Sequence, residues 1–222
     1  IVRGLSLRTD YDTTLDETVG VVTAASGANY VGMEATTASD DSDIIVNDLV
    51  RLNNATLNVR GTNLGGSSSQ ENELRIGDAD NRDAFIGAMI GGGGAVDSTN
   101  ISIVPWIIGE STAGALAVTH MGNSLVTYDA TSGIRPLSFS TEYAGYGTAG
   151  DTLNIRETLT TDATGLPGRT LNSLVLHNAN TAASTIAVTG AGAGQSITNT
   201  SGTFLLTLNP AADASSAHQF TV

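Results

Sequence analysis

The residues best able to carry chemistry are carboxylates gathered in one short run. Asp78, Asp80 and Asp83 stand with Asn81 in the sequence Asp-Ala-Asp-Asn-Arg-Asp. Carboxylate and amide oxygens at this spacing can converge on Ca²⁺ in a loop. A helix–loop–helix calcium loop would also need a glycine and a distal glutamate, which are missing, and Arg82 lies inside the run. A solvated loop is therefore the competing interpretation, and calcium at these four residues is the only cofactor predicted.

Other acidic residues raise the question of polysaccharide cleavage. A second run, Asp40-Asp41-Ser42-Asp43, could bind a metal or form a solvated loop. Paired acids, or acids with arginine, cleave polysaccharides on the outer faces of some β-helices. Four residues are close enough in sequence to share one coil edge: Glu73, Arg75, Asp78 and Asp80. The sequence does not place them in register, so a lyase or hydrolase is the least favoured function.

No other motif supports catalysis. The chain has no Cys, and His120, His177 and His218 are scattered without metal-ligand spacing, which favours surface or turn positions. The glycine run at 91–94 lacks the Lys-Ser/Thr of a phosphate loop and reads as a flexible turn. We therefore expect that the protein is not an enzyme.

Trp106 is the most distinctive apolar residue, because it is the only Trp in a chain with 5% aromatic residues. A lone exposed Trp could stack on a sugar ring and make Trp106 a ligand-binding residue. The alternative is that Trp106 packs under an insertion and covers a break in the coil.

Composition narrows the class of partner. Only 14% of residues are charged, all 9 basic residues are Arg, and 22 acids give a net charge of -13. Such a surface repels phosphate backbones and anionic lipids, which disfavours nucleic-acid binding and membrane adsorption. No apolar run approaches the ~20 residues of a membrane-spanning helix, so we expect no membrane insertion of this segment.

The elements that must position these residues are short strands. Apolar runs bounded by Gly, Asn and Asp recur along the chain, for example at 44–46, 55–60 and 171–176, whereas Gly, Thr, Asn and Ser interrupt helix-length windows. Inward positions are Leu, Ile and Val, which suit a stack of like aliphatic layers. We predict an all-β fold, a right-handed parallel β-solenoid with loop insertions, and keep a β-sandwich as the alternative.

The predicted strands spread over two regions. Residues 1–150 read as a loop-interrupted solenoid segment, and residues 151–222 as plainer coils continuous with it. Asn residues at 53, 54, 58, 63, 172, 178 and 180 are candidates for coil corners, because Asn tolerates left-handed backbone.

Several blocks resemble one family, the autotransporter-associated β-strand repeat proteins. They occur in the family's order and cover most of the chain from about residue 15 to 209. The blocks are Glu17–Val22 with Ala25–Asn29, Leu49–Arg51 with Ala55–Gly65, Val104–Gly109, Leu125–Asp129, Gly133–Leu137 with Glu142-Tyr143, and Thr170–Leu176. Leu125 stands where the family pattern has Phe.

The resemblance implies large exported bacterial proteins with right-handed β-helical stalks and no shared catalytic activity. We interpret the chain as a structural segment of an extracellular, cell-surface stalk or filament protein. Its expected partners are adjacent repeats or subunits, through stacking or self-association. An adhesin that binds glycans through its loop insertions is the alternative function.

Overall fold

The structure, a computed structural model, is a β-solenoid of about 6 turns with 59% strand and 5% helix. It describes residues 4–9, 14–35, 41–66, 71–112, 123–148, 150–180, 184–193, 195–208 and 218–221. The predicted all-β parallel solenoid is confirmed, and the parallel pairing differs from the antiparallel sheets of a β-sandwich. Among the described residues, no helix has the length and apolar character that a membrane span requires.

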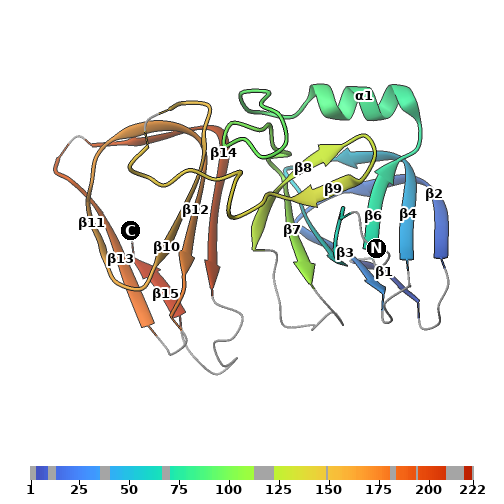
Figure 1. Cartoon of the computed structure of the whole chain (residues 1–222), viewed down its shortest axis with the longest axis horizontal. Coiled ribbons are helices and arrows are strands. Elements are labelled where there is room, and N and C mark those ends of the chain that lie inside the picture. Colours follow the sequence, from blue (N-terminus) through green and yellow to red (C-terminus); the bar gives the residue numbers. More distant parts are fainter. Residues whose placement is uncertain are drawn as a thin grey trace. The chain divides into compact units, whose positions relative to one another are not determined.

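The chain divides into two compact units (Figure 1). The first contains Ile1–Met89 and Ile103–Leu137, and the second contains Ile90–Ser102 and Ser138–Val222. The change of pattern predicted at residue 151 lies inside the second unit.

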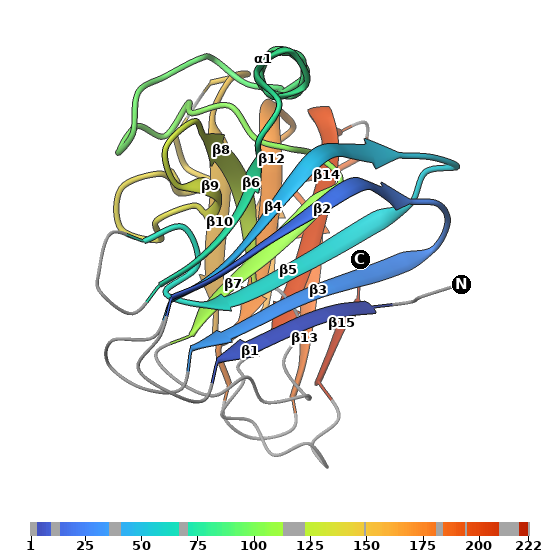
Figure 2. The ribbon, with the colours of Figure 1, turned by 90° about the vertical axis from the view of Figure 1, so that its right-hand side faces the viewer.

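The first unit holds three coils and a closing hairpin. Its elements are β1 Gly4–Thr9, β2 Thr14–Ala24, β3 Ala28–Ala35, β4 Asp41–Arg51, β5 Thr56–Thr62, β6 Glu71–Ile76, α1 Ala79–Gly87, β7 Ile107–Thr112, β8 Ser124–Asp129 and β9 Gly133–Pro136. One face is the parallel series β1-β3-β5-β7, and the other is β2-β4-β6 (Figure 2). Gly4 pairs with Tyr30 and Tyr30 with Asn58, so one coil takes 26 or 28 residues.

Corners between the faces use left-handed backbone where the sequence supplies Asn. Asn53, Asn54 and Asn63 have φ of 48°, 54° and 47°, as predicted for coil corners. Asn58 and Asn172 instead lie within strands, so those two corner predictions are wrong.

Aliphatic columns form the core of the first unit. Ile44 and Leu74 are paired in β4 and β6 and are 1% and 2% exposed, and Val31 and Val59 form a similar pair in β3 and β5. Each side chain is covered by its counterpart in the next coil, which excludes water. Burial of apolar surface stabilises the fold by roughly 25 cal/mol per Å².

Two features close the end of this stack. The hairpin β8–β9 pairs antiparallel with β7 and interrupts the parallel series. Its turn lies against β6, where a Cβ at Gly133, which has φ 69°, would collide with the Leu74 carbonyl oxygen. The backbone N–H of Ile76 also donates to Tyr128 Oη at 2.8 Å. The end of the first stack is thus covered.

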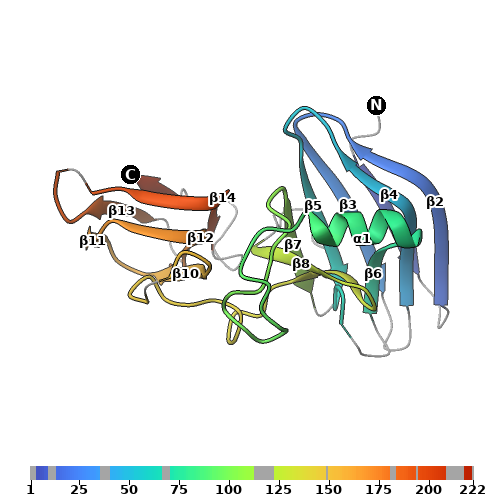
Figure 3. The ribbon, with the colours of Figure 1, turned by 90° about the horizontal axis from the view of Figure 1, so that it is seen from above.

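The second unit also holds three coils. Its strands are β10 Asn154–Leu159, β11 Ala163–Leu166, β12 Arg169–Asn178, β13 Ser184–Gly190, β14 Ile197–Leu208 and β15 His218–Thr221. They form two parallel sheets, β10-β12-β14 and β11-β13-β15, which Figure 3 shows from above. Aliphatic residues of β10, β12 and β13 fill the space between these sheets.

A buried amide ties the first coil of this unit to the insertion at 90–102. Asn154 is fully buried, and its Oδ1 accepts bonds from Asn172 Nδ2 and Ser173 Oγ, both at 2.8 Å. Its Nδ2 donates to the Ile101 carbonyl at 2.8 Å. Because buried polar groups must be paired, this side chain fixes both the coil register and the insertion.

Replacing Asn154 with Ala should destabilise the protein by about 2–4 kcal/mol, because three buried hydrogen bonds are lost. Urea unfolding monitored by circular dichroism measures the change. Thr158→Ala, at an exposed position of the same strand, is the control and should stay within about 0.5 kcal/mol of the parent. Equal effects of the two substitutions would contradict the role given to Asn154.

Candidate functional site

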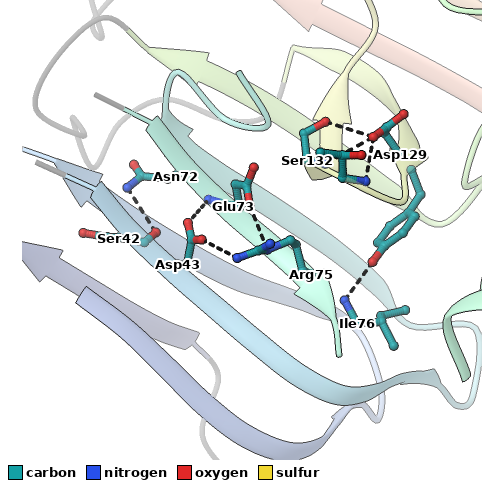
Figure 4. Close-up of polar contacts among 10 residues, drawn as sticks. Ser42, Asp43, Asn72, Glu73, Arg75, Ile76, Asp129 and Ser132 are labelled. Atoms are coloured by element: carbon teal, nitrogen blue, oxygen red, sulfur yellow. Dashed lines mark hydrogen bonds and ion pairs between the residues drawn. The ribbon is translucent and has the colours of Figure 1, made fainter. Parts of the chain in front are cut away.

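The densest group of ionisable side chains lies on the outer face of the β2-β4-β6 sheet. Inward positions of β4 and β6 alternate with outward ones, and the outward positions carry Asp41, Asp43, Glu71, Glu73 and Arg75. We call these five residues the acid–arginine cluster (Figure 4 shows its centre). The parallel register produces this arrangement, since Asp41 pairs with Glu71 and Asp43 with Glu73.

A single guanidinium holds the centre of the cluster. Arg75 Nη2 lies 2.8 Å from Asp43 Oδ2, and Arg75 Nε lies 2.7 Å from Glu73 Oε2. The other oxygen of Asp43, Oδ1, accepts the backbone N–H of Glu73 at 3.0 Å. Asp43 and Glu73 are only 5% and 8% exposed. The two carboxylates therefore share one cation and have little contact with solvent.

Burial and crowding of like charges perturb two of these carboxyls. Burial, followed by the nearby Asp43 charge, raises the pKa of Glu73 to about 7 even though Arg75 lowers it. The pKa of Asp41 is raised to about 6 by burial and again by Asp43. Near neutral pH the cluster thus gains or loses protons over a range in which ordinary carboxyls stay ionised.

A second ion pair lies on the other face of the same unit. Arg60 of β5 and Glu110 of β7 are in register, with Nε and Oε2 at 2.7 Å and the side chains 1% and 5% exposed. The two residues are 50 positions apart in sequence, so this pair brings the chain back into register after the insertion that contains α1.

The predicted calcium residues lie at the start of a helix rather than in a loop. The loop expectation at 79–83 is wrong, because Ala79–Gly87 forms α1 with Asp78 as its N-cap. Asp78 Oδ1 accepts the backbone N–H of Asn81 at 3.0 Å, and Asp83 pairs with Arg82. Among the described residues, no group of three or more His, Asp or Glu side chains is placed to hold a metal ion. Calcium binding at Asp78, Asp80, Asn81 and Asp83 stays a prediction that this geometry does not support.

Of the four residues predicted for polysaccharide cleavage, the structure places only Glu73 and Arg75 together. Glu73 and Arg75 lie side by side on β6, while Asp78 is the N-cap of α1 and Asp80 lies in its first turn. The residue that joins Glu73 and Arg75 instead is Asp43, which lies 30 residues upstream of Glu73 and was not in the predicted grouping. A loose repeat gives no signal for this register, so sequence reasoning could not pair the two residues. Asp40, the first residue of that acidic run, lies outside the described residues.

Trp106 packs against other aromatic side chains, which is one of the two roles predicted for it. Its ring meets Phe85 of α1 edge to face, with centroids 6.3 Å apart, and Phe85 also contacts Tyr128 at 5.3 Å. Trp106 is partly buried against the first core, below the insertion that carries α1. Sugar binding at Trp106 stays a prediction.

The histidines that the structure describes do not form a metal site. His177 lies within β12 rather than in a turn, and its Nδ1 is 2.9 Å from Thr207 Oγ1. Burial, and secondarily Arg156, lowers the pKa of His177 to about 4. His120 lies outside the described residues.

Comparison with known proteins identified no protein-family profile, no curated protein and no solved structure that matches this chain. The resemblance to autotransporter-associated β-strand repeat proteins therefore rests on the sequence blocks alone and stays a prediction.

Because Glu73 holds its proton more tightly in the folded state, its contribution to stability is complete below about pH 4.5. It is lost as the pH rises through about 7. Glu73→Gln should remove this loss, so the unfolding free energy should fall less between pH 5 and pH 8 than in the parent. We expect a difference on the order of 1 kcal/mol from urea titrations.

Glu17→Gln provides the matched control, since Glu17 is an exposed carboxylate on β2. This variant should keep the pH dependence of the parent. A parent and Glu73→Gln variant with parallel pH profiles would show that Glu73 is not the perturbed group.

Proposed function

We propose that this chain is a structural segment of a large extracellular bacterial surface protein, of the stalk or filament kind. The observation that carries the proposal is the pairing of outward charges between successive coils. Asp43, Glu73 and Arg75 join β4 to β6, and Arg60 with Glu110 joins β5 to β7. In both groups the carboxylates are nearly inaccessible.

Such buried pairs support a structural role better than a catalytic one. A general acid or nucleophile must reach the glycosidic bond of its substrate. Glu73 and Asp43 are covered and already bind Arg75, so neither has an open face for a sugar. Removing one partner of a buried pair is costly, so the same contacts hold the coils in register.

The composition supports an extracellular location. A net charge of -13 suits a solvated, exposed surface, because like charges keep copies of the protein apart. Parallel coils satisfy their backbone hydrogen bonds along the stack, which gives a stiff body that resists proteolysis. These properties suit an exposed bacterial stalk, and the sequence blocks described above agree with that role.

Immunogold labelling with antibodies raised against the folded chain tests the location. Intact producing cells, or material shed from them, should carry the label. An antibody to a cytosolic protein should label only permeabilised cells and is the control. Label that appears on the chain only after permeabilisation would contradict the proposal.

A further inference from the structure

One aromatic ring of the second unit is held in place and left open to solvent. Phe139 lies in the turn at 138–142 and is 50% exposed, in a chain with only 5% aromatic residues. The guanidinium of Arg156 lies over the ring, with its Cζ 4.0 Å from the ring centroid, and the Tyr143 ring is tilted beside it at 6.1 Å. Because Arg156 covers one face, solvent reaches the other face and the edge of Phe139.

A buried carboxylate fixes the turn that carries this ring. Glu142 is 0% exposed, and its Oε2 accepts the backbone N–H of Ser138 at 2.8 Å. The backbone N–H of Glu142 donates in return to the Ser138 carbonyl at 3.0 Å. The other carboxylate oxygen, Oε1, accepts the backbone N–H of Asp97 at 3.1 Å, which ties the insertion at 90–102 to the turn. A site on such a fixed turn loses little conformational freedom when a ligand binds.

Hydrogen-bonding groups surround the same turn. Asp97 is exposed, and its Oδ1 accepts the hydroxyl of Thr141 at 2.9 Å. The Oδ2 atom of Asp97 has no hydrogen-bond partner among the described residues. The backbone of Asp97 has φ 66°, in the left-handed region, and residues held in such sparsely populated conformations concentrate at ligand sites. The exposed Ser140 adds a second hydroxyl on the turn.

An open ring face beside a carboxylate and hydroxyls matches the chemistry of a neutral sugar. A pyranose has an apolar face of C–H groups, which can stack on an aromatic ring, and a rim of hydroxyls that donate and accept hydrogen bonds. Phe139 is two residues from Thr141, so the Asp97 carboxylate lies at the edge of the same turn. A carboxylate only accepts, and the hydroxyls of a sugar supply the donors that Asp97 Oδ2 needs.

Other classes of ligand fit these groups less well. A phosphate, sulfate or uronate would meet the Asp97 carboxylate in a chain with a net charge of -13. Arg156, the cation described next to this turn, is already stacked on Phe139. A purely aromatic ligand would cover the ring but leave the carboxylate without a donor. The charge and the hydrogen-bonding groups therefore favour an uncharged ligand that is rich in hydroxyls.

We propose that the turn at 138–142 and Asp97 form a binding site for a neutral pyranose of a glycan. Phe139 stacks on the apolar face of the sugar, and Asp97 and Thr141 bind its hydroxyls. This places at the insertion 90–102 the glycan binding that the sequence left open as an alternative function. The site adds adhesion to the proposed stalk and goes beyond that structural role. One ring on an open surface covers only part of a sugar, so we expect a Kd of about 1 mM for a single site.

A glycan array probed with the whole chain tests the proposal. The chain has no Lys, so its terminal amine takes a single biotin, and display on streptavidin raises the apparent affinity of a weak site. The parent should bind neutral hexose or N-acetylhexosamine glycans in preference to sialylated and sulfated ones. Phe139→Ala should weaken binding to the best neutral glycan by about tenfold or more. Leu52→Ala, at a 49% exposed apolar residue of the first unit, is the matched control and should bind as the parent does.

Two conservative variants separate a ligand contact from a structural role. Phe139→Tyr retains the ring and should keep the affinity within about threefold of the parent. Asp97→Asn retains an acceptor for Thr141 and tolerates left-handed backbone, yet it removes the charge and one acceptor, so binding should weaken by about threefold or more. If circular dichroism shows that Phe139→Ala does not fold, Phe139→Leu takes its place with the same expected loss.

Three outcomes would overturn the proposal. They are a parent that binds no glycan on the array, a parent that prefers anionic glycans, and binding that is unchanged when the ring of Phe139 is removed. Immunogold labelling reports where the protein lies and not what it binds, so either proposal can fail alone.

Discussion

Parallel pairing between successive coils is the constraint on which the other features of this structure depend. A coil that follows the register of its predecessor places like residues over one another, so an apolar position becomes a column of apolar side chains. The column Ile44–Leu74 is nearly free of solvent because each member is covered by the next. The same rule leaves every stack with two end layers that the stack itself cannot cover. The hairpin β8–β9 covers one such layer.

The same register also accounts for the buried charges. Stacking sets Asp43 beside Glu73 about 4.8 Å apart, which is unfavourable for two carboxylates. Arg75 pairs with both carboxylates. Burial of Glu73 and the nearby Asp43 charge nevertheless raise the pKa of Glu73. Asn154 satisfies the hydrogen bonds of buried uncharged groups, because its amide serves as both donor and acceptor in the interior. Polar residues in the stack thus fix the register, while the apolar columns supply most of the burial.

Much of the fold could be predicted from local sequence. The aliphatic runs around Leu57 and Leu174 indicate buried strands, and Asn53 with Asn54 indicates a corner. Helix α1 is not predicted by the sequence pattern, because its nine residues are fewer than three turns and its first turn contains Asp80 and Asn81, which are typical of loops. Asp78 as an N-cap, followed by the apolar pair Phe85 and Ile86, was the available signal.

The candidate site was less accessible to prediction. Glu73 and Arg75 are neighbours in sequence, but their contact with Asp43 depends on a register of 30 residues. Coil lengths vary, since Tyr30 pairs with Asn58 after 28 residues and Leu57 with Ile107 after 50. A pattern without a fixed period cannot identify which outward residues meet. The antiparallel hairpin that closes the first stack depends on such contacts as well, because Gly133 lies against a carbonyl of β6.

The register itself can be measured directly by cysteine cross-linking, since the chain contains no Cys. Thr18 and Ile45 are paired on the outer face of β2 and β4, at a separation that a disulfide spans. The doubly substituted chain Thr18→Cys with Ile45→Cys should form an intramolecular disulfide rapidly under mild oxidation. Thr18→Cys with Asn47→Cys, displaced by two residues to roughly 8 Å, should not. A disulfide in the displaced pair, or none in the aligned pair, would contradict the parallel in-register stack.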